Sequence, residues 1–471
     1  MRKFHWVHAA AAWCAAGALG CGNGDDTTTI SPPDAAAEAG DATSSHDGEV
    51  PEAATEAGPP DGATSGAEAA FMPDVAGDSG SDAAGVQETG APPADAGPPK
   101  RLLLSYNGSS QSELAAFGLD SRAIDGRLVY PGFIGATFVG RGAPWLLEQS
   151  VDVVARLDPG RPWVVGSSWN VALSDRPDGG YSYSDPVGVV VTAGNKAYVL
   201  RYTRNDVAVL DASQGVDAGA PAGTIDLGGQ VQAGGDGVVE MSAGVYVASR
   251  QILYVLLGNI DKNNVGCNGY CFLCSTTHPT VVGIDVASDK LVDLNGSAPG
   301  TALTLDGYSP VFGTGAMAYD AAQDRLIVLE TGCNETAADG GVGPIVRREV
   351  EELSLFTGAS RTLLDLDTQG FPQSLTYIDA HRAIVQLDST YAWDPTTSAL
   401  GRTIPNAPDA FAWDGADALL GLSTRYGADG GLQGYDVVSV RIADGAVTKL
   451  GADPFTLTGG FLGGVGLWPA P

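Results

Sequence analysis

Beyond Arg101 the chain alternates short apolar runs with polar turns. The runs are rich in Val, Leu, Ile and Tyr, and the turns between them contain Gly, Asp and Asn. No long stretch has the three- and four-residue apolar spacing of an amphipathic helix. Short β-type runs with regular turns favour a sandwich, barrel or propeller, so we expect an all-β domain over residues 100–471.

One stretch displays a repeating unit most clearly. It consists of a hairpin over Val189–Leu200, a loop, the strand Asp206–Asp211 and, after a turn and an insertion, the strand Gly223–Leu227. The order strand, turn, strand, loop, strand, turn, strand is a four-stranded meander, which is the unit of a propeller blade.

The unit recurs along the chain with variations. Hairpins equivalent to its first half are expected at Met241–Leu257, Gly315–Leu329, Ser374–Leu387 and Ala410–Leu422. Hairpins equivalent to its second half are expected at Leu114–Tyr130, Val151–Val165, Val281–Leu294, Val350–Leu366, Thr390–Ile404 and Val437–Leu450. Successive second hairpins lie roughly 50 residues apart, near the length of a propeller repeat with insertions. About 370 residues then predict about seven blades, with six or eight still open.

The chain ends in a lone strand, Gly463–Pro469. Its expected partner is Arg101–Tyr106, at the other end of the domain. A C-terminal strand that joins the N-terminal blade would close the ring and cover both sheet edges, which otherwise invite aggregation.

The clearest blade resembles the YVTN-type propeller repeat. The similarity lies in Gly194–Val199, with its Tyr198-Val199 pair, in the Asp-ending strand Asn205–Asp211 and in Gly223–Asp226. It covers about a tenth of the chain directly, and the other blades match the pattern weakly. The resemblance implies a β-propeller blade; these residues specify strand packing and not a reaction.

The N-terminus has the features of a secretory signal. Arg2 and Lys3 precede a mainly apolar run from about Ala9 to Leu19, which is too short for a mature membrane-spanning helix. The ending Ala18-Leu19-Gly20-Cys21 resembles the bacterial lipobox, although Ala18 stands where Leu is favoured. The resemblance implies cleavage before Cys21 and acylation of Cys21, and Gly22 in place of Asp implies the outer membrane, with periplasmic or surface orientation open. The alternative is a plain secretory signal cleaved near Gly20.

Residues 21–99 differ sharply in composition from the rest. Ala, Asp, Glu, Gly, Pro, Ser and Thr dominate residues 22–99, which contain sixteen acidic residues, no Lys or Arg and one aromatic residue, Phe71. Such a segment cannot bury enough apolar surface to offset its ordering entropy. We therefore expect a disordered acidic linker between the lipidated Cys21 and the folded domain.

The formal net charge of −31 limits the partners. Nucleic acid is excluded as a partner, because phosphate binding requires Lys and Arg to release counterions. The same charge disfavours electrostatic docking on anionic lipid, which leaves the predicted lipid anchor as the contact with a membrane.

Four cysteines belong to the folded part: Cys267, Cys271, Cys274 and Cys333. In an exported protein they most simply form two disulfides, with three possible pairings. Cys267 and Cys333 each follow a strand of neighbouring blades, so a bridge between them is geometrically plausible. Two other interpretations are less favoured by the spacing: an iron–sulfur motif over Cys267, Cys271 and Cys274, and a metal site that adds His278 to these cysteines.

Other candidate chemistry is sparse. His381 falls in an expected hairpin turn, and Asn259–Asn263 is interpreted as a turn, not as half of a calcium loop. Arg201 and Arg204 flank Tyr202 in a segment that we expect to be a surface loop, and the alternative is that the two arginines face a ligand. No Gly-x-Ser-x-Gly elbow or phosphate-binding Gly-x-x-x-x-Gly-Lys motif is present, and no metal ligand or catalytic residue is named.

The sequence therefore predicts a lipid-anchored cell-envelope propeller that binds or scaffolds an unidentified protein or glycan. The alternative is an enzyme of lactonase-like or quinoprotein-like type, with a metal or cofactor at the mouth of the central channel. The cofactor is left unknown. A ring of inward carboxylates, Asn and His at the channel mouth would favour the enzyme, and the sequence cannot place such a ring.

Overall fold

The computed structural model describes residues 99–139, 142–172, 183–192, 195–215, 219–266, 271–295, 301–310, 315–338 and 340–470. The predicted signal, Cys21 and the acidic linker lie outside these residues. Within the described ranges, no helix has both the length and the apolar character needed to cross a membrane.

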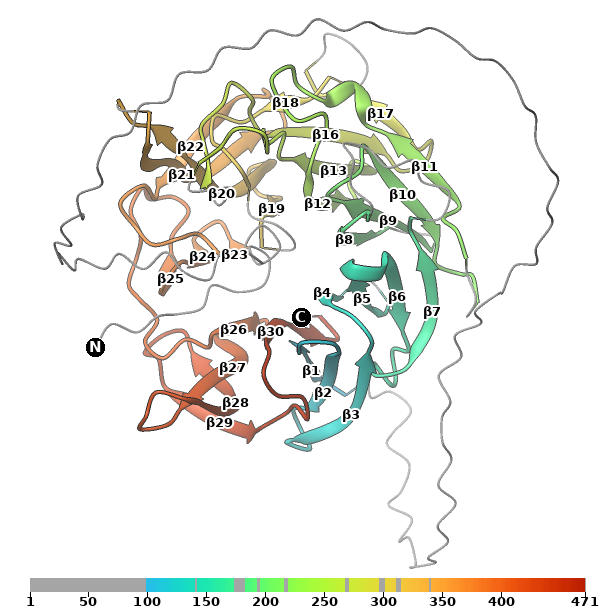
Figure 1. The fold of residues 1–471 in the computed structure, drawn as a ribbon, viewed down its shortest axis with the longest axis vertical. Coiled ribbons are helices and arrows are strands. Elements are labelled where there is room, and N and C mark those ends of the chain that lie inside the picture. Colours follow the sequence, from blue (N-terminus) through green and yellow to red (C-terminus); the bar gives the residue numbers. More distant parts are fainter. Residues whose placement is uncertain are drawn as a thin grey trace, which may run out of the picture. The chain divides into compact units, whose positions relative to one another are not determined.

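Seven antiparallel sheets form a ring, as a β-propeller (Figure 1). The first three blades, each given from the innermost strand outward, are β30 (Phe461–Trp468), β1 (Arg101–Asn107), β2 (Ser112–Gly118) and β3 (Ala123–Tyr130); β4 (Ile134–Val139), β5 (Pro144–Glu148), β6 (Val153–Leu157) and β7 (Val165–Asn170); and β8 (Pro186–Val191), β9 (Lys196–Arg201), β10 (Asp206–Asp211) and β11 (Gly223–Asp226).

The remaining four blades follow the same plan with two departures, an added β18 in the fourth blade and three strands in the sixth. Their strands are β12 (Met241–Val247), β13 (Ile252–Leu257), β16 (Thr280–Asp285), β17 (Lys290–Val292) and β18 (Leu303–Thr304); β19 (Met317–Asp320), β20 (Arg325–Thr336), β21 (Val342–Ser354) and β22 (Ser360–Asp365); β23 (Ser374–Asp379), β24 (Arg382–Gln386) and β25 (Thr390–Trp393); and β26 (Ala410–Trp413), β27 (Ala418–Tyr426), β28 (Leu432–Arg441) and β29 (Val447–Ala452).

The hydrophobic core lies between neighbouring blades. The second strand of each blade is apolar on both sides, as in Leu102–Leu104 of β1 and Leu326–Leu329 of β20, because one blade packs against each side of it. Leu102, Leu104 and Tyr106 pack against Leu422 and Val437 of the seventh blade, and comparable clusters fill the other interfaces around the ring. The apolar runs in the sequence are therefore continuous and not strictly alternating.

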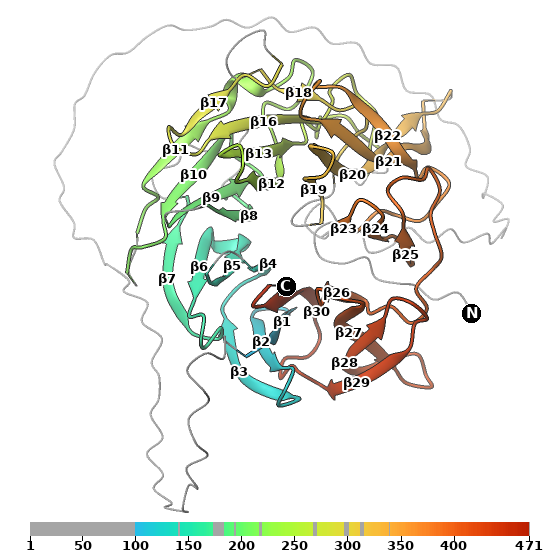
Figure 2. The same ribbon diagram turned by 180° about the vertical axis from the view of Figure 1, so that it is seen from behind.

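The two ends of the domain close the ring. Strand β30 pairs antiparallel with β1, from Arg101 opposite Trp468 to Asn107 opposite Phe461. The two strands lie side by side in both views (Figures 1 and 2). This confirms the predicted partnership of the C-terminal strand with the first apolar run.

The sequence predicted most of the blades correctly. The meander of β8, β9, β10 and β11 is present, and the seven-blade arrangement agrees with the spacing of the expected hairpins. Two features differ. The hairpin of β4 and β5 was not foreseen, and the expected hairpin Thr390–Ile404 consists of β25 and a single bridge between Tyr391 and Thr403.

The topology gives the propeller two distinct faces. Successive strands within a blade run in opposite directions, so the second strands of all blades end at one face. We call this the second-strand face; it carries the loops between second and third strands and the connections between blades. The turns inside the first and second hairpins of each blade lie at the opposite face.

Candidate functional site

The face opposite the second-strand face is built from tight turns. At several of them an Asp ends a strand and its carboxylate accepts a backbone N–H two or three residues later. Examples are Asp285 with Ser288, Asp379 with His381 and Asp394 with Thr396. These Asx-type turns satisfy their own polar groups locally. The connections at this face are therefore short.

The second-strand face carries the long elements. Strands β20 and β21 have 12 and 13 residues, and their pairing continues outward to Thr336 opposite Val342. Strands β27 and β28 form a second long hairpin that ends at Tyr426 opposite Leu432. We call these the first arm (residues 331–348) and the second arm (residues 423–436).

Most of the exposed large apolar side chains of the described residues belong to elements at this face. Within the described part of the chain, eight large hydrophobic residues are exposed, and six of them belong to elements that meet at the second-strand face. The six are Val129, Val151, Val342, Tyr426, Leu432 and Phe461. Exposed apolar groups concentrated on one side of a protein mark an interaction surface more often than scattered ones do.

A disulfide fixes the first arm at its base. Cys333, inside β20, is bonded to Cys274, with Cα atoms 5.0 Å apart. Leu273 bridges Asn334, and the Cys274 N–H donates to the Asn334 carbonyl at 2.8 Å. Leu273 and Cys274 thus lie beside the outer part of β20.

The predicted disulfide bonding is confirmed for Cys333, but its partner is Cys274, so the geometrically plausible pairing of Cys267 with Cys333 does not form. The sequence analysis ended the strand near Leu329 and placed Cys333 in a loop, whereas β20 continues to Thr336 and is paired there by Cys274. This disulfide also removes Cys274 from the iron–sulfur interpretation and from the metal site with His278. Cys267 and the side chain of Cys271 lie outside the described residues, so their pairing stays a prediction.

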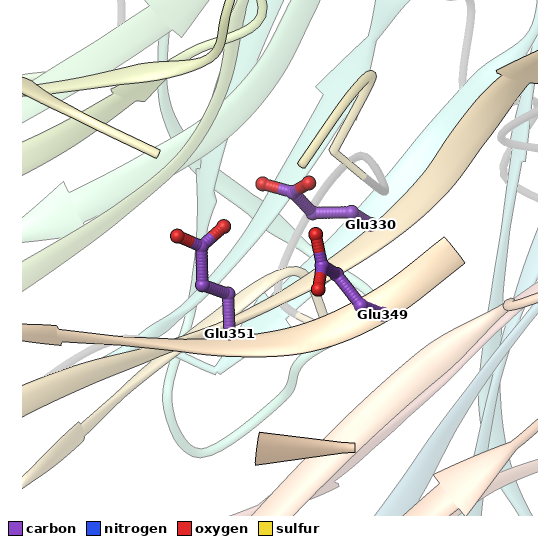
Figure 3. Close-up of side chains that lie close together, drawn as sticks. All are labelled: Glu330, Glu349 and Glu351. Carbon is purple, nitrogen blue, oxygen red and sulfur yellow. The ribbon is translucent and has the colours of Figure 1, made fainter. Parts of the chain in front are cut away.

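At the base of the first arm three carboxyl groups meet (Figure 3). Glu330 of β20 is directly opposite Glu349 of β21, and Glu351 is two residues further along β21. Directly opposite residues share a face of the sheet, and so do residues two apart, so all three side chains lie on one face. One ligand oxygen from each can be chosen so that all three lie within 4.8 Å of one another. We call Glu330, Glu349 and Glu351 the glutamate trio.

The segment Asp306–Pro310 covers the glutamate trio. The backbone N–H groups of Asp306 and Gly307 donate to the Glu351 carboxylate at 2.9 and 3.1 Å. A Cβ atom on Gly307 would lie 1.2 Å from Oε2 of Glu330, so this carboxyl occupies the space that any larger residue would need. Glu349 accepts a hydrogen bond from the hydroxyl of Thr362.

The trio members are not equally satisfied. All three are buried, and neither carboxylate oxygen of Glu330 has a hydrogen-bond partner of ordinary geometry. Burial raises the pKa of Glu330 well above its ordinary value, and Glu351 and Glu349 raise it further, whereas the nearby N–H of Tyr308 has an opposing effect. Burial raises the pKa of Glu351 to about 7 against the two N–H donors, and it also raises the pKa of Glu349.

A second buried charge cluster is balanced by a cation. Lys262 lies 3.2 Å from Glu240 and 3.7 Å from Asp236, with its ammonium 4.4 Å from the centre of the Tyr202 ring. Glu240 also accepts the N–H of Ile260 at 2.7 Å. Opposite charges and hydrogen bonds meet here across the third and fourth blades, which is the pattern of a structural network. The glutamate trio differs from this network. Among the described residues, the charged side chains that shift the pKa values of the trio are all carboxylates.

Two arginines were misplaced by the sequence analysis. Arg201 and Arg204 are buried and do not belong to a surface loop. Arg201 forms an ion pair with Asp206 and donates to the Val171 carbonyl, and Arg204 donates to the carbonyls of Tyr183 and Thr203. Each guanidinium group has five N–H donors, and the two side chains use them to satisfy backbone carbonyls at the edge of the third blade.

The remaining candidates agree with their expected turns. His381 is largely exposed at the turn between β23 and β24, where its N–H binds Asp379. Asp261 caps the turn at Asn263, as expected for Asn259–Asn263. The sequence alone predicts no metal ligand, and the glutamate trio is visible only in the structure. The signal was present as Glu349-x-Glu351 in one strand and a Glu at the end of the apolar run Leu326–Leu329, but strand register was needed to join them.

Comparison with known proteins identifies no family for this chain. No protein-family model matches the chain, and no curated protein matches it. The chain is similar in structure to a proposed 6-phosphogluconolactonase from Bacteroides fragilis, with 11% identity, 80% of this chain and 99% of that chain covered, and a TM-score of 0.42. It is also similar to Kuenenia stuttgartiensis hydrazine synthase, with 12% identity, 78% and 98% coverage and a TM-score of 0.42. The YVTN-type resemblance and the lipobox resemblance stay predictions.

Proposed function

We propose that this protein is a lipid-anchored binding protein of the bacterial outer membrane that recognises a protein partner through its second-strand face. The observation that carries the proposal is the contrast between the two faces of the propeller. One face consists of short Asp-capped turns, and the other presents two arms and six of the eight exposed large hydrophobic residues of the described chain.

The disulfide supports the same assignment. It holds the base of the first arm against the segment before Cys274, so less conformational freedom is lost when a partner binds the arm. The predicted anchor at Cys21 and the acidic linker would present this surface at a distance from the lipid. The enzyme alternative calls for ligands at the channel mouth. The trio, which is the one group of three possible metal ligands among the described residues, lies instead on the second and third strands of its blade.

Photo-crosslinking in producing cells tests the recognition face. A photoreactive benzoylphenylalanine replaces Tyr426 or Val342 on the second-strand face, or Phe356, which is 89% exposed on the opposite face, as the matched control. We expect one discrete protein adduct from the first two positions and none from Phe356. Equal labelling from all three, or adducts that contain only envelope polysaccharide, would contradict the proposal.

The anchor has its own test. We expect the wild-type chain to fractionate with outer membranes and the Cys21→Ser variant to be released in soluble form, because acyl chains on one Cys supply the membrane affinity. Intact mass measurement of the processed chain locates the modification. A Cys21→Ser variant that still fractionates with membranes would refute the anchor and leave the recognition face untouched.

A further inference from the structure

The strongest unexplained feature of the molecule is the arrangement of Glu330, Glu349 and Glu351. Like charges directly opposite each other in an antiparallel pair are unfavourable, and a buried carboxylate without hydrogen bonds is more so. Glu330 combines both conditions, since Glu349 faces it across the strands and neither of its oxygens is satisfied. Replacement by a hydrophobic residue would remove the cost, so a ligand that needs these oxygens explains their presence.

We propose that the glutamate trio binds one Ca²⁺ ion at the base of the first arm. The three carboxyl groups converge from β20 and β21 on a common point (Figure 3). Hard cations take carboxylate oxygens as ligands, and Ca²⁺ accepts six to eight of them at about 2.3–2.6 Å in flexible geometry. One oxygen from each carboxyl group lies within 4.8 Å of the other two, which is close enough for a single ion of this kind to contact all three.

The surroundings favour this ion over Mg²⁺. Mg²⁺ demands near-ideal octahedral geometry and gives up its bound water reluctantly, so a buried site built from three carboxyl groups suits it less well than Ca²⁺. The N–H groups of Asp306 and Gly307 hold Glu351 and the hydroxyl of Thr362 holds Glu349, so these two carboxyl groups are not free to rearrange into a strict octahedron. Glu330, whose oxygens have no hydrogen-bond partner of ordinary geometry, supplies the oxygens that the ion would satisfy.

The expected consequence is local and mechanical. The ion would join β20 to β21 at the base of the first arm, through the side chains of the glutamate trio and beneath the covering segment Asp306–Pro310. The inference stands on the contacts of the trio alone and does not depend on the proposed binding partner.

Calorimetric titration of the purified full chain, stripped with EDTA, tests the site. We expect one equivalent of Ca²⁺ per chain with affinity at least about tenfold higher than that for Mg²⁺, and a higher Tm with Ca²⁺ than with EDTA. Glu330→Gln keeps the shape of the side chain and should abolish the stoichiometric site. The matched control is Glu335→Gln, which removes the same charge from an exposed position of the same strand. It should leave binding unchanged, which would show that the effect of Glu330→Gln does not come from the net charge of −31.

A second variant keeps all three carboxylates. Gly307→Ala places a methyl group where Oε2 of Glu330 now lies, so it should weaken Ca²⁺ binding at least about tenfold by displacing that carboxyl. Circular dichroism shows whether each variant is folded. Wild-type protein that takes up no stoichiometric Ca²⁺, or folded Glu330→Gln and Gly307→Ala variants that bind it as the wild type does, would overturn the proposal. A wild-type protein whose Tm is the same with Ca²⁺ as with EDTA, and lower than that of Glu330→Gln under both conditions, would show instead that the trio holds protons only.

Discussion

At the scale of single residues, the molecule places several carboxyl groups where water cannot reach them, and Glu148 is the simplest case. It ends β5, is 3% exposed and has one oxygen without a hydrogen-bond partner. Burial raises the pKa of Glu148 to about 8, against the opposing effect of the Tyr130 hydroxyl that binds it. Glu148 is therefore neutral at neutral pH, which lowers the cost of burying it.

The pKa of Glu148 makes stability depend on pH in a defined direction. Because the folded state binds this proton more tightly than the unfolded state, the stabilisation is complete below about pH 4.5 and is lost as the pH rises through about 8. We expect the free energy of unfolding of the wild type to fall by about 2–4 kcal/mol more than that of Glu148→Gln between pH 5 and pH 9. Urea unfolding at pH 5, 7 and 9 measures it, and parallel curves for the two proteins would contradict the prediction.

At the scale of elements, the first arm depends on a covalent contact more than on apolar packing. Residues 331–336 of β20 contain no large aliphatic side chain, and the strand persists there because β21 pairs with one edge and the segment around Leu273 with the other. Cys274 and Cys333 join this segment to the arm across 59 residues of sequence. The arm should therefore lose order when the bond is removed.

The change to test is Cys333→Ala. In the chain-entropy treatment, a loop of 59 residues corresponds to about 4 kcal/mol, and native disulfides typically contribute 2–4 kcal/mol, so we expect a loss of about 2–4 kcal/mol. Urea unfolding of the variant and the wild type measures the difference. Mass spectrometry of non-reduced peptides supplies the control. A Cys267–Cys333 peptide, or equal stability of the two proteins, would exclude this role for the bond.

The elements also show what a sequence can and cannot predict here. Hairpins with Asp-capped turns, such as the one from Asp285 to Ser288, were predicted because the turn chemistry is local. The outer part of β20 was missed because neither its composition nor its periodicity marks a strand. The glutamate trio was missed for a related reason: Glu330 and Glu349 are neighbours only through register, which depends on where the arm turns.

At the scale of the whole molecule, the propeller is closed by a strand from the far end of the chain. Strand β30 supplies the innermost strand of the first blade, and Leu462 and Leu467 join the core between the first and seventh blades. In a ring each blade is stabilised by both neighbours, so the contribution of β30 extends beyond its own sheet. The aggregation-prone edge of β1 is covered only by this pairing.

Truncation after Gly460 tests this closure directly, because it removes β30 and nothing else of the described propeller. We expect the edge of β1 and the apolar surface between the first and seventh blades to become accessible to other chains, so the truncated protein should elute as oligomers or aggregate during size-exclusion chromatography. Truncation after Trp468 is the matched control: it retains all of β30, including the Trp468 side chain that donates to the Pro159 carbonyl, and should remain monodisperse like the full chain. If the protein ending at Gly460 eluted and melted as the full chain does, the ring would not require its C-terminal strand, and the six other blades would have to hold the first one in place.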